Sequence, residues 1–205
     1  AETVFAVTPP RAATTPFSVL APHGRAAATP TTLENSYGAK VVVEGAGFLL
    51  NDEMGDFNKK PGWTNLDGDI GTDANLIAPG KRMLSSMTPT IVTRDGKAVL
   101  VTGSPGGRTI INTVFDIVVN VLEWGMSAQA AVDAPRVHHQ WLPDEARLEA
   151  DAVPDATLER LRAMGHRIRQ SGQQGDGHTI LVDLTTGTAW GANDRRSSNS
   201  KASVP

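Results

Sequence analysis

The hydrophobic pattern changes character between residues 90 and 123. Residues 91–94 and 97–102 are apolar and β-branched stretches separated by Asp95-Gly96, which predicts a β-hairpin. Residues 108–123 follow helical spacing with a wide apolar face. The apolar positions of this helix are Ile110, Ile111, Val114, Phe115, Ile117, Val118, Val121 and Leu122. A strand-to-helix junction is therefore expected near residues 103–107.

Two adjacent glycines, Gly106 and Gly107, occupy this junction within Ser104-Pro105-Gly106-Gly107. Glycine lets a backbone approach a ligand closely, and free N–H groups at a helix start can face an anion or a developing oxyanion. A tight turn without any ligand explains the same spacing. The pattern by itself leaves both interpretations open.

Two further helices and several strands are predicted elsewhere. Ser127 can cap a helix through Val132, and Pro154 can start another that ends at Gly165. Pro16 and Pro30 interrupt the first two strand candidates. The order of strands, a buried helix, a second helix and more strands predicts an α+β fold. The strand candidates are residues 14–20, 26–33, 40–43, 47–50, 167–169, 178–184 and 188–190.

Three segments lack such patterns. Residues 1–13 contain Pro9-Pro10 and are predicted to be a linker. Residues 58–80 are punctuated by glycine and proline and are expected to form a long loop, a feature that is usually functional or disordered. The serine-rich tail, residues 197–205, is expected to fray.

The composition narrows the class of protein. With 205 residues, 40% hydrophobic and 20% charged, the chain can form one globular domain. A net charge of −3 without a basic block argues against nucleic acid as the main partner. The absence of cysteine excludes disulfides and a Cys nucleophile. No apolar run is long enough for a membrane span, and no signal peptide is recognised.

Three polar clusters carry candidate chemistry. Residues 51–57 hold three carboxylates within five positions, which is typical of a solvated turn or of a cation site for a metal or a substrate ammonium. Ser85-Ser86 follows Lys81-Arg82 and could hold a carboxylate. His138 and His139 are adjacent, so on a strand they point to opposite sides and suit one metal poorly. We expect neither a metal nor a cofactor.

Several common catalytic patterns are missing. The Ser104 region is not the G-x-S-x-G of a hydrolase elbow, and there is no P-loop, dinucleotide-binding G-x-G-x-x-G or H-E-x-x-H. A Thr-Thr pair, an acidic cluster, a Ser-Ser pair and a Gly-Gly turn remain. One scheme uses these parts: a threonine whose own α-amine is the base, with backbone donors as the oxyanion hole.

Four segments in register resemble the small subunit of γ-glutamyltranspeptidases: residues 51–57, 84–92, 102–107 and 134–144. The similarity runs in order from Thr31 to Arg196. It implies an N-terminal nucleophile hydrolase with an αββα sandwich, of which this chain supplies only part. It also implies a precursor that cuts itself into a large and a small subunit. Such enzymes transfer the γ-glutamyl group of glutathione and related amides to water, an amino acid or a peptide.

The resemblance assigns the catalytic roles. Thr14 falls at the position of the nucleophile, and Thr32 at that of a second threonine that hydrogen-bonds it. The backbone N–H groups of Gly106 and Gly107 would form the oxyanion hole. Because Thr14 is in a peptide bond with Ala13, activity requires cleavage between these two residues.

The resemblance also assigns the substrate contacts. Glu53 and Asp56 would bind the α-ammonium of the glutamyl group, and Ser85 and Ser86 its α-carboxylate. Glu34 falls where many members have an asparagine that contacts the substrate.

The domain division that follows is a leader and first-strand region at residues 1–30, a small-subunit-like catalytic domain at 31–196 and the tail at 197–205. The first region departs from the family, because Pro16 stands where members usually have histidine.

The partners implied are a small γ-glutamyl substrate, an acceptor and the large subunit. Family members are commonly periplasmic or extracellular. Two alternatives are an inactive or unprocessed pseudo-subunit and a related cephalosporin or glutaryl acylase.

Overall fold

A computed structural model describes residues 14–198 and 200–203. The expected linker at residues 1–13 lies outside this part of the chain. The main sheet has four antiparallel strands in the order β3-β4-β8-β9. Their bounds are Thr90–Arg94 for β3, Lys97–Gly103 for β4, His178–Val182 for β8 and Ala189–Asn193 for β9. The predicted hairpin at Asp95-Gly96 is confirmed, and both turn residues have positive φ.

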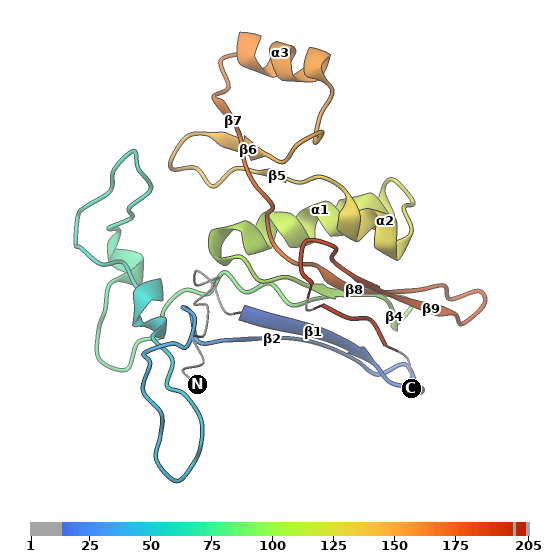
Figure 1. Ribbon diagram of the computed structural model, residues 1–205, viewed down its shortest axis with the longest axis horizontal. Coiled ribbons are helices and arrows are strands. Elements are labelled where there is room, and N and C mark those ends of the chain that lie inside the picture. The colour runs from blue at the N-terminus through green and yellow to red at the C-terminus, as the bar shows by residue number, and fades with distance from the viewer. Residues whose placement is uncertain (1–13, 199, 204–205) are drawn as a thin grey trace, which may run out of the picture.

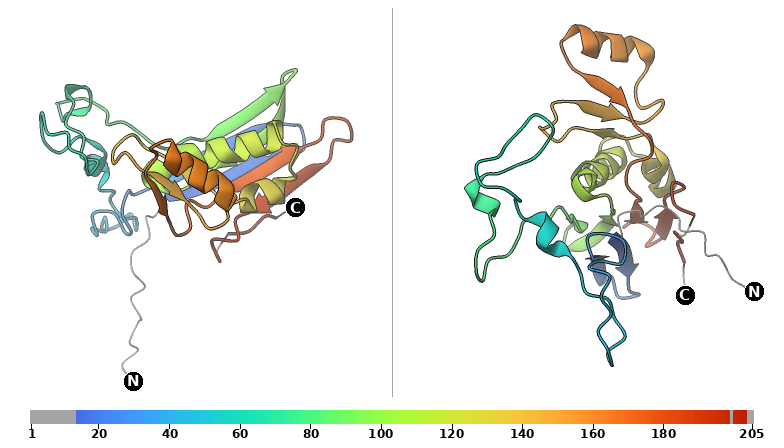
Figure 2. Two further views of the ribbon diagram at one scale, coloured as in Figure 1. Left: turned by 90° about the horizontal axis from the view of Figure 1, so that it is seen from above. Right: turned by 60° about the vertical axis from the view of Figure 1, so that its left-hand side comes forward.

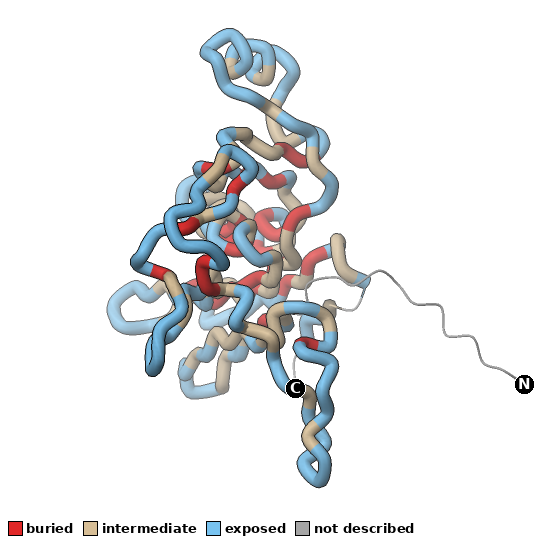
Figure 3. The backbone as a smooth tube through the Cα atoms, turned by 90° about the vertical axis from the view of Figure 1, so that its left-hand side faces the viewer, coloured by how far each residue is buried: buried red, intermediate tan, exposed pale blue. Residues whose placement is uncertain are grey.

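Helices α1, Ile110–Leu122, and α2, Ala128–Asp133, cover one face of this sheet (Figure 1). A 3-10 turn, η3 at Gly107–Thr109, leads into α1. Ser127 caps α2 as predicted, because its hydroxyl accepts a hydrogen bond from the Ala130 N–H at 3.3 Å. Buried apolar side chains of both helices pack against the sheet, including Val121 and Ala131 against Leu100. Figure 3 shows the buried residues concentrated in this central region.

A two-stranded hairpin lies on the opposite face of the sheet (Figures 1 and 2). Its strands are β1, Thr14–Leu20, and β2, Ala26–Thr32. Both predicted interruptions are accommodated, since Pro16 pairs directly with Pro30. Neither proline has an N–H to donate, so this pair suits the non-hydrogen-bonded position of an antiparallel ladder. The hydroxyl of Ser18 donates to the His178 carbonyl at 2.9 Å and ties the hairpin to β8.

A smaller unit extends from the helical layer. Strands β5, Val137–His138, β6, Ala146–Leu148, and β7, Ile168–Gln170, form a three-stranded sheet, with β6 and β7 parallel. Helix α3, Asp155–Ala163, connects β6 to β7 and lies at the outer end of this unit (Figure 1). The helix is confirmed, but its apolar positions are not buried, and Met164 beyond its end is 74% exposed.

The sequence expectations differ from the structure in two places and agree in a third. Residues 40–43 and 47–50 make only an isolated bridge between Val42 and Leu49, because this excursion packs against no buried layer. The short strands β5 and β6 were not predicted, since two or three residues are too few for a periodic pattern. Residues 58–80 form a loop as expected, with one short 3-10 turn, η2, at Asp73–Asn75.

Asp116 on α1 provides a test of the packing between α1 and β5. Burial raises the pKa of this carboxyl to about 6, while the Val137 N–H partly opposes that shift. The folded state therefore holds the proton more tightly than the unfolded state does, and stability falls as pH rises from about 4 to 6. We expect Asp116→Asn to raise the free energy of unfolding at pH 7 by about 1 kcal/mol, a value discounted for partial solvent exposure.

Urea denaturation at pH 4 and pH 7 measures this effect, and Asp151→Asn on an exposed turn is the control. A stability difference between Asp116→Asn and the wild type that is the same at both pH values would contradict the assignment.

Candidate active site

Two threonines from paired strands meet at the open end of the β1-β2 hairpin. Thr14 and Thr32 are register partners, and the Thr14 hydroxyl donates to the Thr32 hydroxyl at 3.0 Å. The Thr32 oxygen also accepts the Glu34 N–H at 2.9 Å. Thr32 in turn hydrogen-bonds the Glu53 side chain. Strand pairing therefore places the predicted nucleophile next to its predicted partner and connects both to the acidic segment.

Three carboxyl groups gather beyond Thr32: Glu34, Glu53 and Asp56. The latter two lie on a 3-10 turn, η1, at Glu53–Asp56. Glu34 has a positive φ of 69° and its carboxylate lies against Gly55, where an added Cβ would come within 2.1 Å of Glu34 Oε1. Glu34 Oε2 and Glu53 Oε1 are buried and have no hydrogen-bond partner within residues 14–198 and 200–203. Buried carboxylate oxygens of this kind attract a cation.

The electrostatics of this cluster agree with its geometry. Burial raises the pKa of Glu34, and the charges of Asp56 and Asp52 raise it further. The pKa of Glu53 is also raised, first by burial and then by Asp56 and Glu34. Burial raises the pKa of Asp56, which a hydrogen bond with Glu53 partly offsets. The charge of Lys59 opposes only part of the shift of Glu34. Like charges held together are costly, and a bound ammonium would relieve the repulsion.

Asn75 joins the acidic turn to the serine pair. Its amide donates to the Asp56 carbonyl at 2.7 Å, and its side-chain oxygen accepts the Leu84 N–H at 2.9 Å. Asn75 is buried, and the neighbouring Asn58 supports it through a backbone hydrogen bond to the Asn75 carbonyl at 2.9 Å. The sequence did not single out either asparagine, because both lie in a loop where asparagine is an ordinary turn residue.

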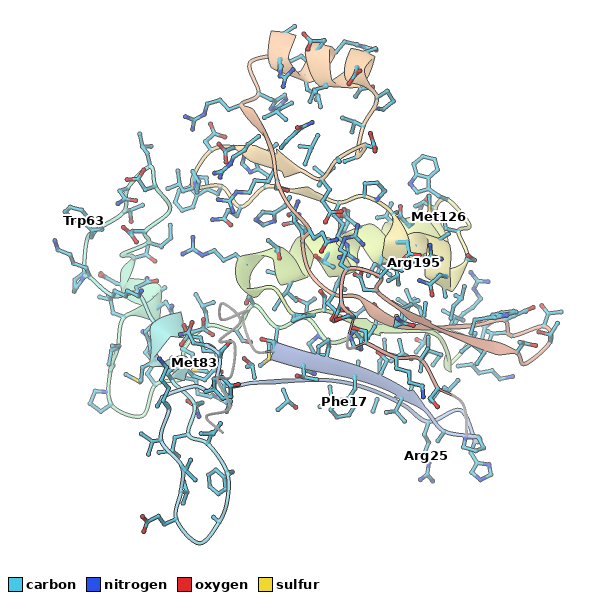
Figure 4. All side chains as sticks on the ribbon, viewed as in Figure 1. Phe17, Arg25, Trp63, Met83, Met126 and Arg195 are labelled. Atoms are coloured by element: carbon cyan, nitrogen blue, oxygen red, sulfur yellow. The ribbon has the colours of Figure 1, made fainter. Side chains whose placement is uncertain are left out.

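One serine of the pair and one glycine of the turn line a pocket of about 650 Å³ together with Glu34 and Asp56. Ser86 lines this pocket, whereas the Ser85 hydroxyl accepts the Met87 N–H at 3.2 Å. Gly107 lines it, and Gly106 precedes it with a φ of 137°. The Gly106 carbonyl accepts hydrogen bonds from both the N–H and the hydroxyl of Thr109. The pocket residues used here are Glu34, Asp56, Ser86 and Gly107, with Lys60 and Trp63 on its loop wall (Trp63 in Figure 4).

The two histidines have separate structural contacts. His138 is buried, with Nδ1 2.7 Å from Asn112 Oδ1 and Nε2 2.9 Å from Gln140 Oε1. His139 is exposed, and its Nε2 lies 3.1 Å from Asp144 Oδ1. The side chains diverge as their adjacency on a strand predicted. Within the described ranges, no group of three or more histidine, aspartate or glutamate side chains is arranged to hold a metal ion.

Solved structures of known proteins show which fold this chain has. The chain superposes with a TM-score of 0.82 on an acivicin-inhibited gamma-glutamyltranspeptidase at 45% identity, covering 90% of this chain and 99% of that one. It superposes with a TM-score of 0.81 on the enzyme from Pseudomonas nitroreducens complexed with L-DON, at 44% identity, covering 93% of this chain and 100% of that one. A cephalosporin acylase from Bacillus halodurans, 24% identical with a TM-score of 0.68, shares the fold over 81% of this chain and 29% of its own. The fold is therefore that of N-terminal nucleophile hydrolases, of which this chain supplies part.

Sequence comparison gives the family within that class. A sequence model of gamma-glutamyltranspeptidase matches residues 2–204. The glutathione hydrolase proenzyme of Escherichia coli strain K12 is 47% identical over 184 residues, which are 90% of this chain and 31% of that protein. The proenzyme of Pseudomonas aeruginosa is 48% identical over 83% of this chain and 31% of its own length. The chain belongs to the gamma-glutamyltranspeptidase family, and it spans about a third of the curated relatives.

Asn75 allows a test of how the pocket is assembled. Replacement by alanine leaves the Asp56 carbonyl and the Leu84 N–H without their buried partner, so we expect Asn75→Ala to lower the free energy of unfolding by about 2 kcal/mol. Asn65→Ala is the control, because Asn65 bonds only within its own turn. Urea denaturation measures both variants, and equal losses would show that Asn75 has no special bridging role.

Proposed function

We propose that this chain is the nucleophile-bearing part of an enzyme that transfers or hydrolyses γ-glutamyl groups of glutathione-like amides. The observation that carries the proposal is the continuous contact from Thr14 through Thr32 to Glu34 and Glu53. Each of these two carboxylates has one buried oxygen without a hydrogen-bond partner among the described residues. Hydrogen bonds thus connect a nucleophile, its hydroxyl partner and an ammonium site. Gly107 of the glycine turn lines one pocket with Glu34 and Asp56 of the ammonium site.

The reaction begins with cleavage of the Ala13–Thr14 peptide bond, which frees the Thr14 α-amine. This amine accepts the hydroxyl proton as Thr14 Oγ attacks the γ-carbonyl, and the backbone N–H groups of Gly106 and Gly107 bind the oxyanion. The tetrahedral intermediate collapses to a γ-glutamyl ester, and the departing amine takes the proton. Water or an acceptor amine then attacks the ester and releases Thr14. In the uncleaved chain the Thr14 hydroxyl donates to Thr32, and this contact positions Thr14 Oγ. After cleavage the hydroxyl proton turns to the freed amine.

Substrate selection rests on the two charged groups that the α-carbon of the glutamyl group carries. Its α-ammonium fits the Glu34, Glu53 and Asp56 cluster, because burial raises the pKa of all three carboxyls and a positive charge also relieves the repulsion that raises the pKa of Glu34 and Glu53 further. Its α-carboxylate fits the hydroxyl of Ser86, which lines the pocket, with Ser85 beside it. An internal residue of an ordinary peptide has neither group free, so the site favours a γ-linked glutamate.

A large-subunit partner fits the exposed apolar surface. Phe17 and Val19 are 48% and 47% exposed on the outer face of the β1-β2 hairpin (Phe17 in Figure 4). Ile111 and Phe115 are exposed one helical turn apart on α1. Neighbouring exposed apolar side chains of this kind are common at interfaces. The names of the curated relatives describe proenzymes, which fits a second subunit cut from the same precursor.

We also propose domain boundaries at residues 30/31 and 196/197 and a periplasmic or extracellular location. Both are drawn from the family resemblance. In the part of the chain that the structure describes, every helix is too short or too polar to span a membrane.

The first test is the nucleophile. In the full-length precursor, we expect Thr14→Ala to prevent cleavage after Ala13 and to abolish release of p-nitroaniline from γ-glutamyl-p-nitroanilide, because both steps need the Thr14 hydroxyl. Intact mass and absorbance measure the two outcomes. Thr15→Ala is the matched control, since Thr15 is exposed on the same strand. A Thr14→Ala protein that still turns over this substrate would refute the assignment, and an uncut wild type without turnover would favour the pseudo-subunit.

The second test separates a glutamyl transferase from a glutaryl acylase. Glutaryl-p-nitroanilide lacks the α-ammonium of the γ-glutamyl substrate but is otherwise matched to it. We expect Asp56→Asn to lower kcat/KM for the γ-glutamyl anilide by about tenfold or more, since a charge-assisted contact is lost. The glutaryl anilide, a poor substrate, should be unaffected or improved. A wild type that prefers the glutaryl anilide would establish the acylase instead.

A further inference from the structure

The segment between β7 and β8 is fastened at both ends by buried carboxylates. It descends from β7 past α1 to the main sheet (Figure 1). The Gln174 N–H donates to Glu149 Oε1 at 2.6 Å, and the Gly177 N–H donates to Asp194 Oδ2 at 2.8 Å. Glu149 follows β6 and Asp194 follows β9, so residues 174–177 are anchored between two separate sheets.

Two arginines hold these carboxylates in place. Arg136 Nη2 pairs with Asp194 Oδ2 at 2.6 Å, and both side chains are almost completely buried. Arg196 binds Glu149 at 2.5 Å and Asp194 at 3.1 Å. Burial alone would raise the pKa of Asp194, but Arg136 and the Gly177 N–H lower it below its ordinary value. The carboxylate therefore stays ionised at neutral pH, and the anchor is a paired charge network of the kind whose partners are costly to remove.

The middle of the segment touches the residue that begins the glycine turn. The Asp176 N–H donates to Ser104 Oγ at 3.0 Å, and Ser104 Oγ donates to the Pro105 carbonyl at 2.8 Å. Ser104 is 1% exposed. Gly175 lies so close that an added Cβ would come within 2.7 Å of both Ser104 Oγ and Thr113 Oγ1. Gly175 Cα would also lie 3.5 Å from a Cβ built on Gly106.

The glycine turn needs support from outside itself. Gly106 and Gly107 have φ values of 137° and 57°, in a region where glycine is permissive and therefore poorly constrained. Their N–H groups can stabilise an oxyanion only if they are held in position before the reaction. Ser104 and Pro105 connect them to β4 on one side, and Thr109 restrains the Gly106 carbonyl on the other.

We propose that residues 174–177 act as a brace that sets the position of the oxyanion donors, with Ser104 as the positioning residue through which the brace acts. This inference rests on the proposed function, since it assumes that Gly106 and Gly107 serve an oxyanion. The glutamyl contacts at Glu34, Asp56 and Ser86 come from other segments. The brace therefore governs the rate of acyl transfer and leaves binding of the glutamyl group intact.

A pair of glycine variants tests the brace in the full-length, processed enzyme. Gly175→Ala places a methyl group against Ser104, and its φ of +67° adds backbone strain. Gly172→Ala makes the same chemical change in the same segment, where nothing lies within 4 Å of the added Cβ. We expect Gly175→Ala to lower kcat for γ-glutamyl-p-nitroanilide by about 10- to 100-fold with KM changed less than about twofold. Gly172→Ala should match the wild type.

Ser104→Ala is the milder second variant and decides the matter if Gly175→Ala fails to fold. It removes the hydroxyl that links Asp176 to Pro105 without adding volume. We expect a fall in kcat of about tenfold, a thermal midpoint close to that of the wild type, and KM unchanged.

Inhibitor affinities separate positioning from general disorder. A γ-boronate analogue of glutamate forms a tetrahedral adduct with a threonine hydroxyl and directs an anionic oxygen at the donors, whereas glutamate itself does not. Both brace variants should bind the boronate about tenfold more weakly and glutamate equally well. Equal losses for both inhibitors, or an unchanged kcat in a folded Ser104→Ala enzyme, would overturn the brace. A wild type and Gly172→Ala that are both inactive would instead refute the proposed function.

Discussion

The buried strand β4 is the element on which the rest of the structure depends. Leu100 and Val101 are completely buried, because α1 and α2 cover one face of the strand and the β1-β2 hairpin covers the other. A strand covered on both faces is fixed in register, since a slip would misplace every side chain at once. Its last residue, Gly103, pairs with His178 and lies near Pro16. The end of β4 therefore places Ser104–Gly107 and the start of β1, with Thr14, at the same side of the molecule.

Two clusters of charged side chains lie on this framework. In one cluster the charges are paired with charges of the opposite sign, and in the other carboxyl groups lie together. Around Arg136 and Asp194, each buried charge has a partner of the other sign, and the network ties α2, β6 and β9 to the segment before β8. Around Glu53, three carboxyls share a partly buried site. Burial raises the pKa of all three, and repulsion from neighbouring carboxylates raises the pKa of Glu34 and Glu53 further. The paired set is suited to holding backbone in place. The cluster of carboxyls around Glu53 resembles a binding site, since a cation that enters it lowers the electrostatic free energy of the carboxylates.

Much of the fold could be predicted from local pattern. The hairpin at Asp95-Gly96, helix α1, the Ser127 cap of α2 and the start of α3 after Pro154 all follow from residues that interact with close neighbours. The failures have a common cause. The Val42–Leu49 bridge and the short strands β5 and β6 depend on what packs against them, and a local pattern does not contain that information.

The sequence by itself determined the family and the kinds of group available: a threonine pair, an acidic turn, a serine pair and a glycine turn in a fixed order. Tertiary structure alone decided which of them meet. Register across β1 and β2 brought Thr14 to Thr32, and the buried Asn75 joined the acidic turn to Leu84, two residues before Ser86. Folding also placed Gly175 against Ser104, two residues 71 positions apart. Such contacts join segments that are distant along the chain, and close packing in the folded state selects them.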